Sequence, residues 1–204
     1  MAEINYEALV KALKERRFLP EVYETAEEAK AAALRIIGNK SVGIGGSATV
    51  RDMGLAEALQ ANGNEVYWHW LAAKEAKQAA RDKALNADVY MSSSNALTMD
   101  GRLVNIDGTG NRAAGLIYGP HEVVVIVGKN KIVTGLDEAI ERIKRDTCPG
   151  NARRLGLDTP CAKTGKCCDC RTAARMCNVT FIHEGPTRPV KAFHVLIVKE
   201  DLGL

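Results

Sequence analysis

The sequence predicts an α/β fold in which a mostly parallel sheet carries helices on both faces. Strand-like and helix-like segments alternate from residue 41 to residue 145, which is the pattern of βαβ units. The segment EVVVIV at 122–127 is an uninterrupted apolar run, as expected for a strand that is covered on both faces. Thr25 and Glu28 have the spacing of a capping box, which predicts a helix from there to about Ile37.

The remaining elements follow from periodicity and from the glycine, proline and asparagine residues between them. Residues 1–18 carry apolar side chains at helical spacing, and Pro20 ends this helix. Further helices are expected at 50–61, 72–85, 113–118 and 136–145. Strands are expected at 41–45, 65–71, 87–91, 103–107 and 122–127, with a brief extended piece at 131–133. A C-terminal pair of strands is expected at 179–183 and 193–198.

Length and composition indicate a globular chain of one large domain or two small ones, and we expect a single domain over residues 1–204. The chain is 46% hydrophobic and 26% charged, which is typical of folded proteins and argues against disorder. Its net charge of +3 is too balanced to indicate a nucleic-acid partner. It contains no apolar run of the roughly 20 residues that a membrane span needs, and its N-terminus lacks a signal-peptide core. We therefore expect a cytoplasmic protein that binds neither nucleic acid nor membrane.

Residues 146–178 form a cysteine-rich, loop-like segment with a predicted metal site. The first 147 residues contain no cysteine, Cys148 lies just upstream of the cluster, and five cysteines then fall within 17 residues: Cys161, Cys167, Cys168, Cys170 and Cys177. A cytosolic chain that concentrates its cysteines in this way more often binds metal than forms a disulfide scaffold. Reduced thiols without metal and a redox-sensing dithiol are the alternatives.

The predicted ligands follow a C-x5-C-x2-C-x6-C spacing: Cys161, Cys167, Cys170 and Cys177. Four thiolates suit an iron–sulfur cluster or a tetrahedral zinc ion. Structural zinc usually shows two C-x2-4-C knuckles and this segment has one, which favours a [4Fe–4S] cluster over zinc. Cys148 and Cys168 are spare thiols or replacements for one ligand.

Three glycine-rich or polar loops follow predicted strands, where ligands of open parallel sheets bind. The candidate ligand-binding residues are Gly45, Gly46, Ser47, Asn95, Asp107, Gly108, Gly110, Asn111 and Arg112. Arg112 can fork two hydrogen bonds to a carboxylate or phosphate, and the N–H groups at 45–47 can hold an anion. Asn95, Asp107 and Asn111 would orient polar groups. A plain tight turn at 45–47 and turn capping by Asp107 and Asn111 are the alternatives.

The four histidines have no metal-ligand spacing with one another, so each is expected to pack in the core or to lie on the surface: His69, His121, His183 and His194. His183 is the best exception because it follows the cysteine segment. Trp68 and Trp70 are expected to pack on a sheet face.

Five stretches of this chain resemble the lactate-utilization (LUD) domain family: Val42-Gly-Ile-Gly-Gly-Ser47, Ser93-Ser-Asn-Ala96, Leu103-Val-Asn-Ile-Asp-Gly-Thr-Gly-Asn-Arg112, Val127-Gly-Lys-Asn-Lys-Ile-Val133 and Pro160-Cys-Ala-Lys-Thr-Gly-Lys-Cys167. The resemblance covers almost the whole chain. It implies the fold of sugar-phosphate isomerases and CoA transferases, and a link to lactate oxidation through multi-subunit iron–sulfur complexes without flavin. The chain lacks the repeated C-x2-C-x2-C-x3-C runs of the large subunit of such complexes and an obvious glutamate of the CoA-transferase type.

The resulting expectation is a protein of lactate or 2-hydroxy-acid utilization that acts as a subunit of an oxidoreductase system. It binds a small anionic metabolite at the strand ends and an iron–sulfur cluster, or zinc, on the cysteine segment. A redox partner subunit and a homo-oligomer are its expected assemblies, and no catalytic residue is assigned. One alternative is a non-catalytic ligand-binding or regulatory subunit with structural zinc. Another is an isomerase or transferase for a phosphorylated sugar or acyl-CoA, with Asp107 as its general base.

Overall fold

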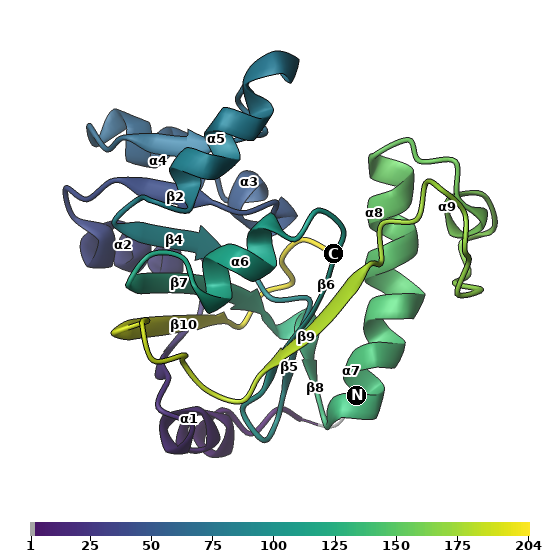
Figure 1. Ribbon diagram of the computed structural model, residues 1–204. Helices are drawn as coiled ribbons and strands as arrows, with labels where there is room; N and C mark the ends of the chain where they lie inside the picture. The colour runs from purple at the N-terminus through teal and green to yellow at the C-terminus, as the bar shows by residue number, and fades with distance from the viewer. Residues whose placement is uncertain (1–2) are drawn as a thin grey trace.

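A six-stranded parallel sheet forms the centre of the computed structural model, which describes residues 3–204 (Figure 1). In spatial order its strands are β1 (Leu19–Tyr23), β10 (Ala192–Val198), β7 (Glu122–Gly128), β4 (Val89–Ser92), β2 (Val42–Ile44) and β3 (Val66–Trp68). Every neighbouring pair is parallel. The predicted α/β fold with a parallel sheet is therefore confirmed. Across residues 3–204 there is no helix with the length and apolar character needed to span a membrane.

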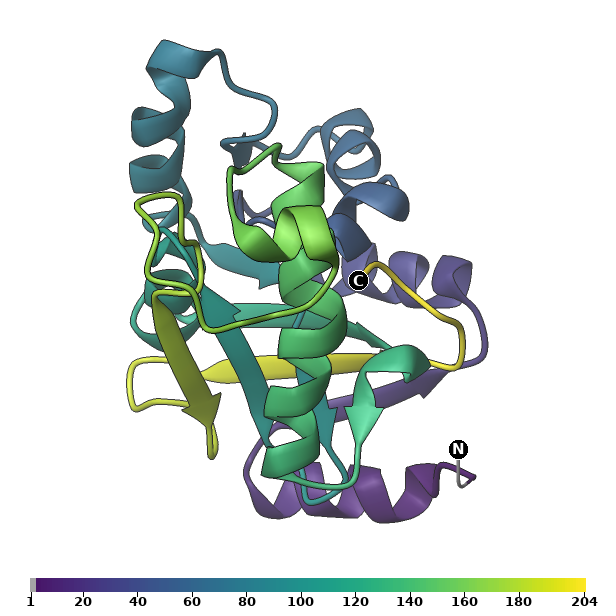
Figure 2. The same cartoon turned by 90° about the vertical axis from the view of Figure 1, so that its right-hand side faces the viewer.

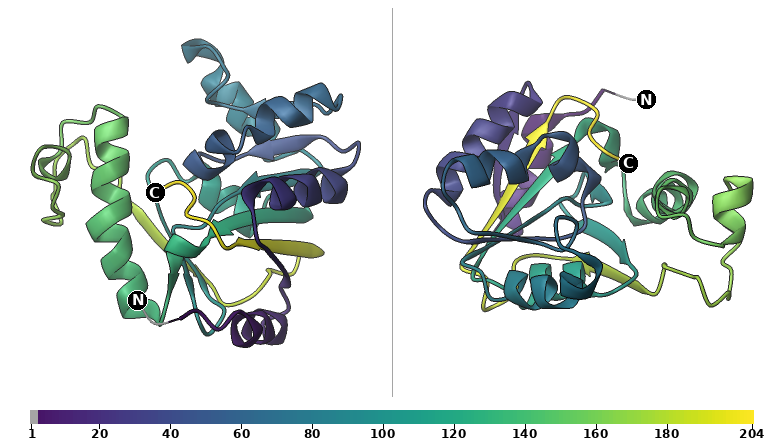
Figure 3. Two further views of the ribbon diagram at one scale, coloured as in Figure 1. Left: turned by 180° about the vertical axis from the view of Figure 1, so that it is seen from behind. Right: turned by 90° about the horizontal axis from the view of Figure 1, so that it is seen from above.

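Helices cover both faces of this sheet, as Figure 3 shows from above. One face packs against α2 (Ala26–Ile37), α3 (Ala48–Asp52) and α4 (Leu55–Ala61). The other packs against α1 (Tyr6–Glu15), α5 (Lys77–Ala84) and α6 (Asn111–Ile117). A short 3-10 turn, η1 (Lys74–Ala76), precedes α5.

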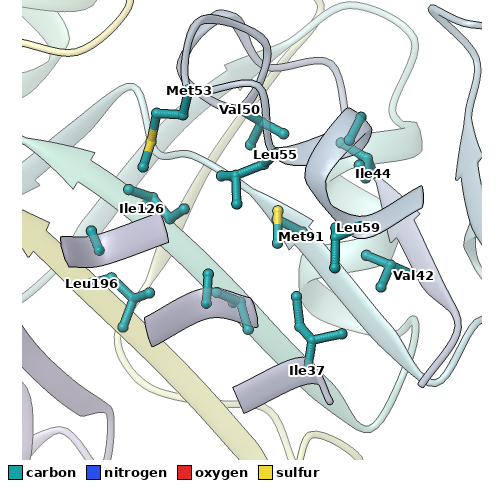
Figure 4. Packing of buried hydrophobic residues seen from close by; sticks show 14 of the residues in the cluster. Ile37, Val42, Ile44, Val50, Met53, Leu55, Leu59, Met91, Ile126 and Leu196 are labelled. Carbon is teal, nitrogen blue, oxygen red and sulfur yellow. The ribbon is translucent and has the colours of Figure 1, made fainter. Parts of the chain in front are cut away.

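The apolar run in β7 is explained by this double cover. Val124 and Ile126 point into the cluster beneath α2, α3 and α4, where Figure 4 shows Ile126 beside Met91 and Leu55. Val123, Val125 and Val127 point to the opposite cluster. Because alternate side chains of a strand face opposite sides, a strand between two helical layers must be apolar at every position. Polar side chains are consequently confined to the ends of such strands.

A second, four-stranded sheet crosses one end of the first. Its order is β8 (Ile132–Val133), β5 (Ala96–Thr98), β6 (Leu103–Asp107) and β9 (Val179–His183). A long helical rod packs on it through Ala139, Ile143 and Cys148 (Figure 2). The rod comprises α7 (Leu136–Arg142), the π-helical turn η3 (Ile143–Thr147) and α8 (Cys148–Arg154). The 3-10 turn η2 (Lys129–Lys131) joins β7 to β8.

Several elements differ from the sequence-based expectation. Strand β1 was missed because Pro20 indicated only a helix end, whereas an edge strand tolerates proline because one side of it has no partner to bond. The short β5 was also missed. Residues 146–178 contain α8 and a further helix, α9 (Pro160–Thr164), and are not all loop. The helix expected at 50–61 is two helices that meet at Gly54, whose φ is +60°.

The elements expected at the two ends of the chain are present, with one difference in strand pairing. The two C-terminal strands exist, but they do not pair with each other: β9 pairs with β6, and β10 lies between β1 and β7. The helix expected at 1–18 is found as α1, and residues 1–2 of that range lie outside the described residues.

The doubly covered strand gives a stability prediction. Ile126→Ala removes a side chain with no exposed surface from the centre of the sheet, so we expect it to lower the free energy of unfolding by about 2–5 kcal/mol. Leu155→Ala, at an exposed position, is expected to change it by less than about 0.5 kcal/mol. Urea unfolding followed by circular dichroism measures both. Equal effects of the two substitutions would contradict the central position of β7.

Candidate functional site

A cavity of about 620 Å³ lies at the carboxyl ends of the parallel strands. Its walls come from the segments that follow β2, β3, β4, β6 and β7. Of the nine candidate ligand-binding residues, seven line it: Gly46, Ser47, Asn95, Asp107, Gly108, Asn111 and Arg112. Gly45 lies against the wall, since a Cβ there would be 3.2 Å from Cγ of Arg112. Gly110 shapes the loop through its φ of +88°, which favours glycine.

Arg112 is held in place by a network centred on Asn95. Its Nη2 donates to Asn95 Oδ1 at 2.9 Å and to the carbonyl of Ile106 at 2.7 Å. The amide of Ile106 donates to the same Asn95 Oδ1 at 3.0 Å. These two hydrogen bonds use both hydrogens of Nη2. Arg112 can therefore donate single hydrogen bonds to a ligand from Nη1 or Nε, but not the expected pair of parallel hydrogen bonds that includes Nη2. Burial lowers the pKa of the guanidinium, and Asp107 opposes that shift.

Asp107 and Ser47 act as helix caps within the cavity wall. Asp107 accepts from the amide of Gly108 at 2.8 Å and from that of Ala113 at 3.0 Å, one bond on each carboxylate oxygen. Ser47 Oγ accepts from the amide of Val50 at 3.2 Å, at the start of α3. The short helices α3 and α6 thus have protein acceptors at their N-termini, which is the capping arrangement weighed above for Asp107.

Lys131 is a cavity residue that the sequence reasoning missed. It is 3% exposed, and its Nζ donates to Thr49 Oγ1 at 2.7 Å and to Ser93 Oγ at 3.0 Å. Burial, followed by the charges of Arg142 and Arg112, lowers its pKa to about 7, while Asp52 acts in the opposite direction. The sequence offered one partial signal, since residues just beyond a parallel strand lie at the edge of the sheet where ligands bind, but it did not distinguish Lys131 from the exposed Lys129.

The outer part of the cavity is aromatic and basic. The guanidinium carbons of Arg154 and Arg51 lie 4.5 Å and 5.9 Å from the ring centroid of Trp70. Burial, followed by the charges of Arg81 and Lys77, lowers the pKa of His69 to about 4, so its imidazole is neutral. Trp68, Trp70 and His69, which were expected only to pack or lie on the surface, all line the cavity.

Three buried polar atoms on these walls have no hydrogen-bond partner among residues 3–204: Trp68 Nε1, His69 Nδ1 and Arg81 Nε. Buried polar groups are normally bonded, so each of these requires an explanation. A polar ligand in the cavity supplies one.

Positive charge dominates the cavity. Its cationic side chains are Arg51, Lys77, Arg81, Arg112, Lys131 and Arg154, whereas Glu57 and Asp107 are its only acidic side chains within the described chain. Within that same part of the chain, Arg51 alone of the six forms a salt bridge, to Asp52. Buried charges are normally paired, so the unpaired Arg112 and Lys131 make the cavity suitable for an anion.

All six cysteines line a second, smaller cavity of about 90 Å³. This set comprises the four predicted ligands, Cys161, Cys167, Cys170 and Cys177, together with Cys148 and Cys168. Lys144 and Arg175 line the same cavity and offset thiolate charge. The fold thus brings the whole cluster together, including the two cysteines that the spacing left without a role.

Two of these thiols are in contact. Cys177 Sγ and Cys148 Sγ are 3.3 Å apart. The hydrogen bond with Cys148, followed by the charges of Arg175 and Lys144, lowers the pKa of Cys177. The same hydrogen bond and burial raise the pKa of Cys148. Cys177 is therefore the thiolate of the pair.

Six thiols give the small cavity a donor set that suits either an iron–sulfur cluster or a zinc ion. No group of three or more His, Cys, Asp or Glu side chains within residues 3–204 converges on a point suitable for one metal ion. Tetrahedral zinc needs four ligands at about 2.3 Å from one centre. In an iron–sulfur cluster each thiolate ligates a different iron, so thiolates are the donors that such a cluster requires.

The two cavities share a wall made by Ile106, Cys148 and Met176. Gly108 permits this proximity, because a Cβ at that position would lie 2.8 Å from the carbonyl oxygen of Met176. Cys148 follows the π-helical turn η3, a distortion that occurs frequently at functional sites. A ligand in the large cavity therefore lies next to the cysteine cluster.

His183 has no part in either cavity. Its ring is buried beside Phe181 and Phe193, and Nε2 lies 3.2 Å from the carbonyl of Leu116. His183 therefore packs in the core, as expected of the four histidines in general. The structure does not place it at the cysteine segment, where it was the best candidate for a further role.

Comparison with known proteins gives a family and a fold. The family model described as "LUD domain" matches residues 6–198. The chain belongs to the LUD domain family. A solved structure, that of a DUF162 family protein from Deinococcus radiodurans, matches this LUD domain protein with a TM-score of 0.54, 14% sequence identity and coverage of 95% of both chains. At this identity the match concerns the fold alone. The search of curated proteins found no match.

The buried amine predicts a pH-dependent stability. Because the pKa of Lys131 is lower in the folded chain, the unfolded chain binds more protons above pH 7, and the stability contribution of this residue rises with pH. Relative to Lys131→Met, the wild-type protein should gain about 2 kcal/mol in unfolding free energy between about pH 7 and about pH 9. Denaturant unfolding at several pH values measures this.

The control is Lys129→Met, which removes an exposed lysine two residues away. Its unfolding free energy should run parallel to that of the wild type over the same pH range. If the unfolding free energy of Lys131→Met also runs parallel to that of the wild type, the Lys131 amine is protonated over the whole pH range.

Proposed function

We propose that this LUD domain protein binds a small anionic metabolite of the 2-hydroxy-acid class in the large cavity and carries an iron–sulfur cluster on its cysteine segment. It then serves as a subunit of an oxidoreductase system. The association of the LUD domain family with lactate utilization supports this class of metabolite.

The anion part of the proposal is supported by charge and by orphaned donors. Lys131 and Arg112 are buried at the inner end of the cavity without a carboxylate in salt-bridge contact among the described residues. A carboxylate ligand would supply the missing counter-charge and accept from Arg112 Nη1. The hydroxyl of a 2-hydroxy acid can bond to Asn95 or Ser93, which line the same end.

The cluster part is supported by the convergence of the cysteines. Cys161, Cys167, Cys170 and Cys177 are the thiolates that would hold the cluster, and the side chains of Lys144 and Arg175 would balance their charge. A bound iron–sulfur cluster supplies one-electron transfer. Cys148 lines both cavities and is the thiol closest to a ligand in the larger one.

The single observation that carries the proposal is the wall shared by the two cavities. An anion site and a cysteine cluster on opposite sides of a protein would be two unrelated features. Here Ile106, Cys148 and Met176 line both cavities. The isomerase or transferase alternative lacks comparable support, since both carboxylate oxygens of Asp107 already accept backbone bonds.

Metal content tests the cluster directly. Protein purified without oxygen should contain about four irons per chain and absorb broadly in the visible region. Cys167→Ala should lower the iron content strongly, because it removes one predicted ligand. Iron, sulfide and zinc are measured per chain, with Cys168→Ala as the matched control at the adjacent position. One zinc per chain without colour would instead support the non-catalytic alternative with structural zinc.

Anion binding is tested by tryptophan fluorescence, since both tryptophans of the chain line the large cavity. Titration with lactate should change the emission, and Arg112→Gln should weaken the affinity about 10- to 100-fold by removing a charge-assisted bond. Arg35→Gln, on an exposed part of α2, should leave it unchanged. A folded Arg112→Gln protein with wild-type affinity would refute the assignment of this site.

A further inference from the structure

Lys131 has the surroundings of a reactive amine. Its Nζ contacts the hydroxyls of Thr49 and Ser93 at 2.7 Å and 3.0 Å, and the side chain is 3% exposed. All three residues line the large cavity. Lysines that serve only as surface charges are solvated, whereas this amine lies inside a ligand cavity without a salt bridge among the residues that the structure describes.

We propose that Lys131 is a nucleophile that condenses reversibly with the ketone of a 2-oxo acid, forming an imine in the large cavity. This inference rests on the proposed anion site and extends it, because it names the oxidised partner of the 2-hydroxy acid as a ligand. Removal of two hydrogens from a 2-hydroxy acid yields a 2-oxo acid. Only the latter has a carbonyl that an amine can attack.

The condensation balances without an oxidant. The amine lone pair attacks the carbonyl carbon, and the π electrons of the carbonyl move to its oxygen. A proton passes from nitrogen to that oxygen, which gives a carbinolamine. The hydroxyl takes up a proton and leaves as water while the nitrogen lone pair forms the C=N bond, which gives a protonated imine. Loss of the remaining N–H proton gives the imine and replaces the proton that the hydroxyl took up. Ser93 and Thr49 are the hydroxyls in contact with Nζ and can pass these protons.

The surroundings of Lys131 favour the reactive form of the amine. Nucleophilic lysines are activated by desolvation or by a neighbouring cation. Lys131 has both: burial and the charges of Arg142 and Arg112 lower its pKa to about 7, and Asp52 is the acidic group that acts against them. The neutral amine is thus well populated near neutral pH.

The same neighbours select a 2-oxo acid over a simple ketone. Arg112 is fixed by Asn95 and lines the same cavity as Lys131, with Nη1 and Nε available to a carboxylate. A 2-oxo acid carries its carboxylate one bond from the carbonyl carbon. Arg112 and Lys131 line one cavity, so they can serve the carboxylate and the adjacent carbonyl of the same ligand.

Reductive trapping tests the inference. The wild-type holoprotein is incubated with pyruvate and sodium cyanoborohydride near neutral pH, and the product is analysed as intact protein and as peptides by mass spectrometry. We expect one adduct per chain, on Lys131, with labelling at least tenfold above that of Lys129. Lactate, which has no ketone, should give no adduct under the same conditions.

Two variants and a binding measurement separate the possible failures. Lys131→Arg keeps the charge and should bind pyruvate while losing the adduct, and Lys129→Met should be labelled like the wild type. Pyruvate binding that is seen by tryptophan fluorescence without any adduct overturns the imine and leaves the anion site standing. Absence of both binding and adduct overturns the anion site and the imine together. Labelling that is spread evenly over exposed lysines overturns the imine.

Discussion

Burial of a parallel sheet on both faces determines where this protein can place polar chemistry. Strand β7 is apolar at every position between its first and last residues because helices cover it on both sides. Lys131 can therefore stand only beyond its end, and the same holds for Asn95 beyond β4 and for Gly46 beyond β2. The large cavity is the place where these ends meet. The charge of the cavity is therefore set by the residues that follow the strands.

That placement has an energetic consequence. Charged groups removed from water without a counter-ion destabilise the folded state or lose their charge. Arg112 is supported by two hydrogen bonds, to Asn95 and the carbonyl of Ile106, and the charge of Asp107 opposes the fall of its pKa. Lys131 has only hydroxyl partners, and its pKa falls. Departures from the rules of stable packing occur most often at functional sites. Lys131, a buried amine with only hydroxyl partners, is such a departure.

The sequence predicted the fold and most of the large cavity because both depend on local signals. The run at 122–127 identified a doubly covered strand, and the loops at 45–47 and 107–112 identified strand ends. Lys131 was missed since lysine after a strand is common, and only the tertiary fold shows that it is buried. Trp68 packs in the core as expected, whereas the contact of the Trp70 ring with Arg154 of α8 depends on the tertiary fold. Strand β1 escaped notice because its place at the sheet edge, which makes Pro20 acceptable, is a property of the whole sheet.

Cys148 shows most clearly how sequence spacing and spatial proximity differ. By spacing it is an outlier, 13 residues before the next cysteine. In space it touches Cys177 and lines both cavities, because the π-helical turn joins α7 to α8 without a break and carries the thiol over the second sheet. Burial of Cys148 opposes its ionisation, whereas Cys177 has Arg175 and Lys144 nearby. Under the proposed function the two thiols have different tasks: Cys177 would hold the cluster, and Cys148 would lie between that cluster and the ligand as a neutral, polarizable side chain. Electrons that pass between the proposed anion and the proposed cluster would then cross the residues that line both cavities.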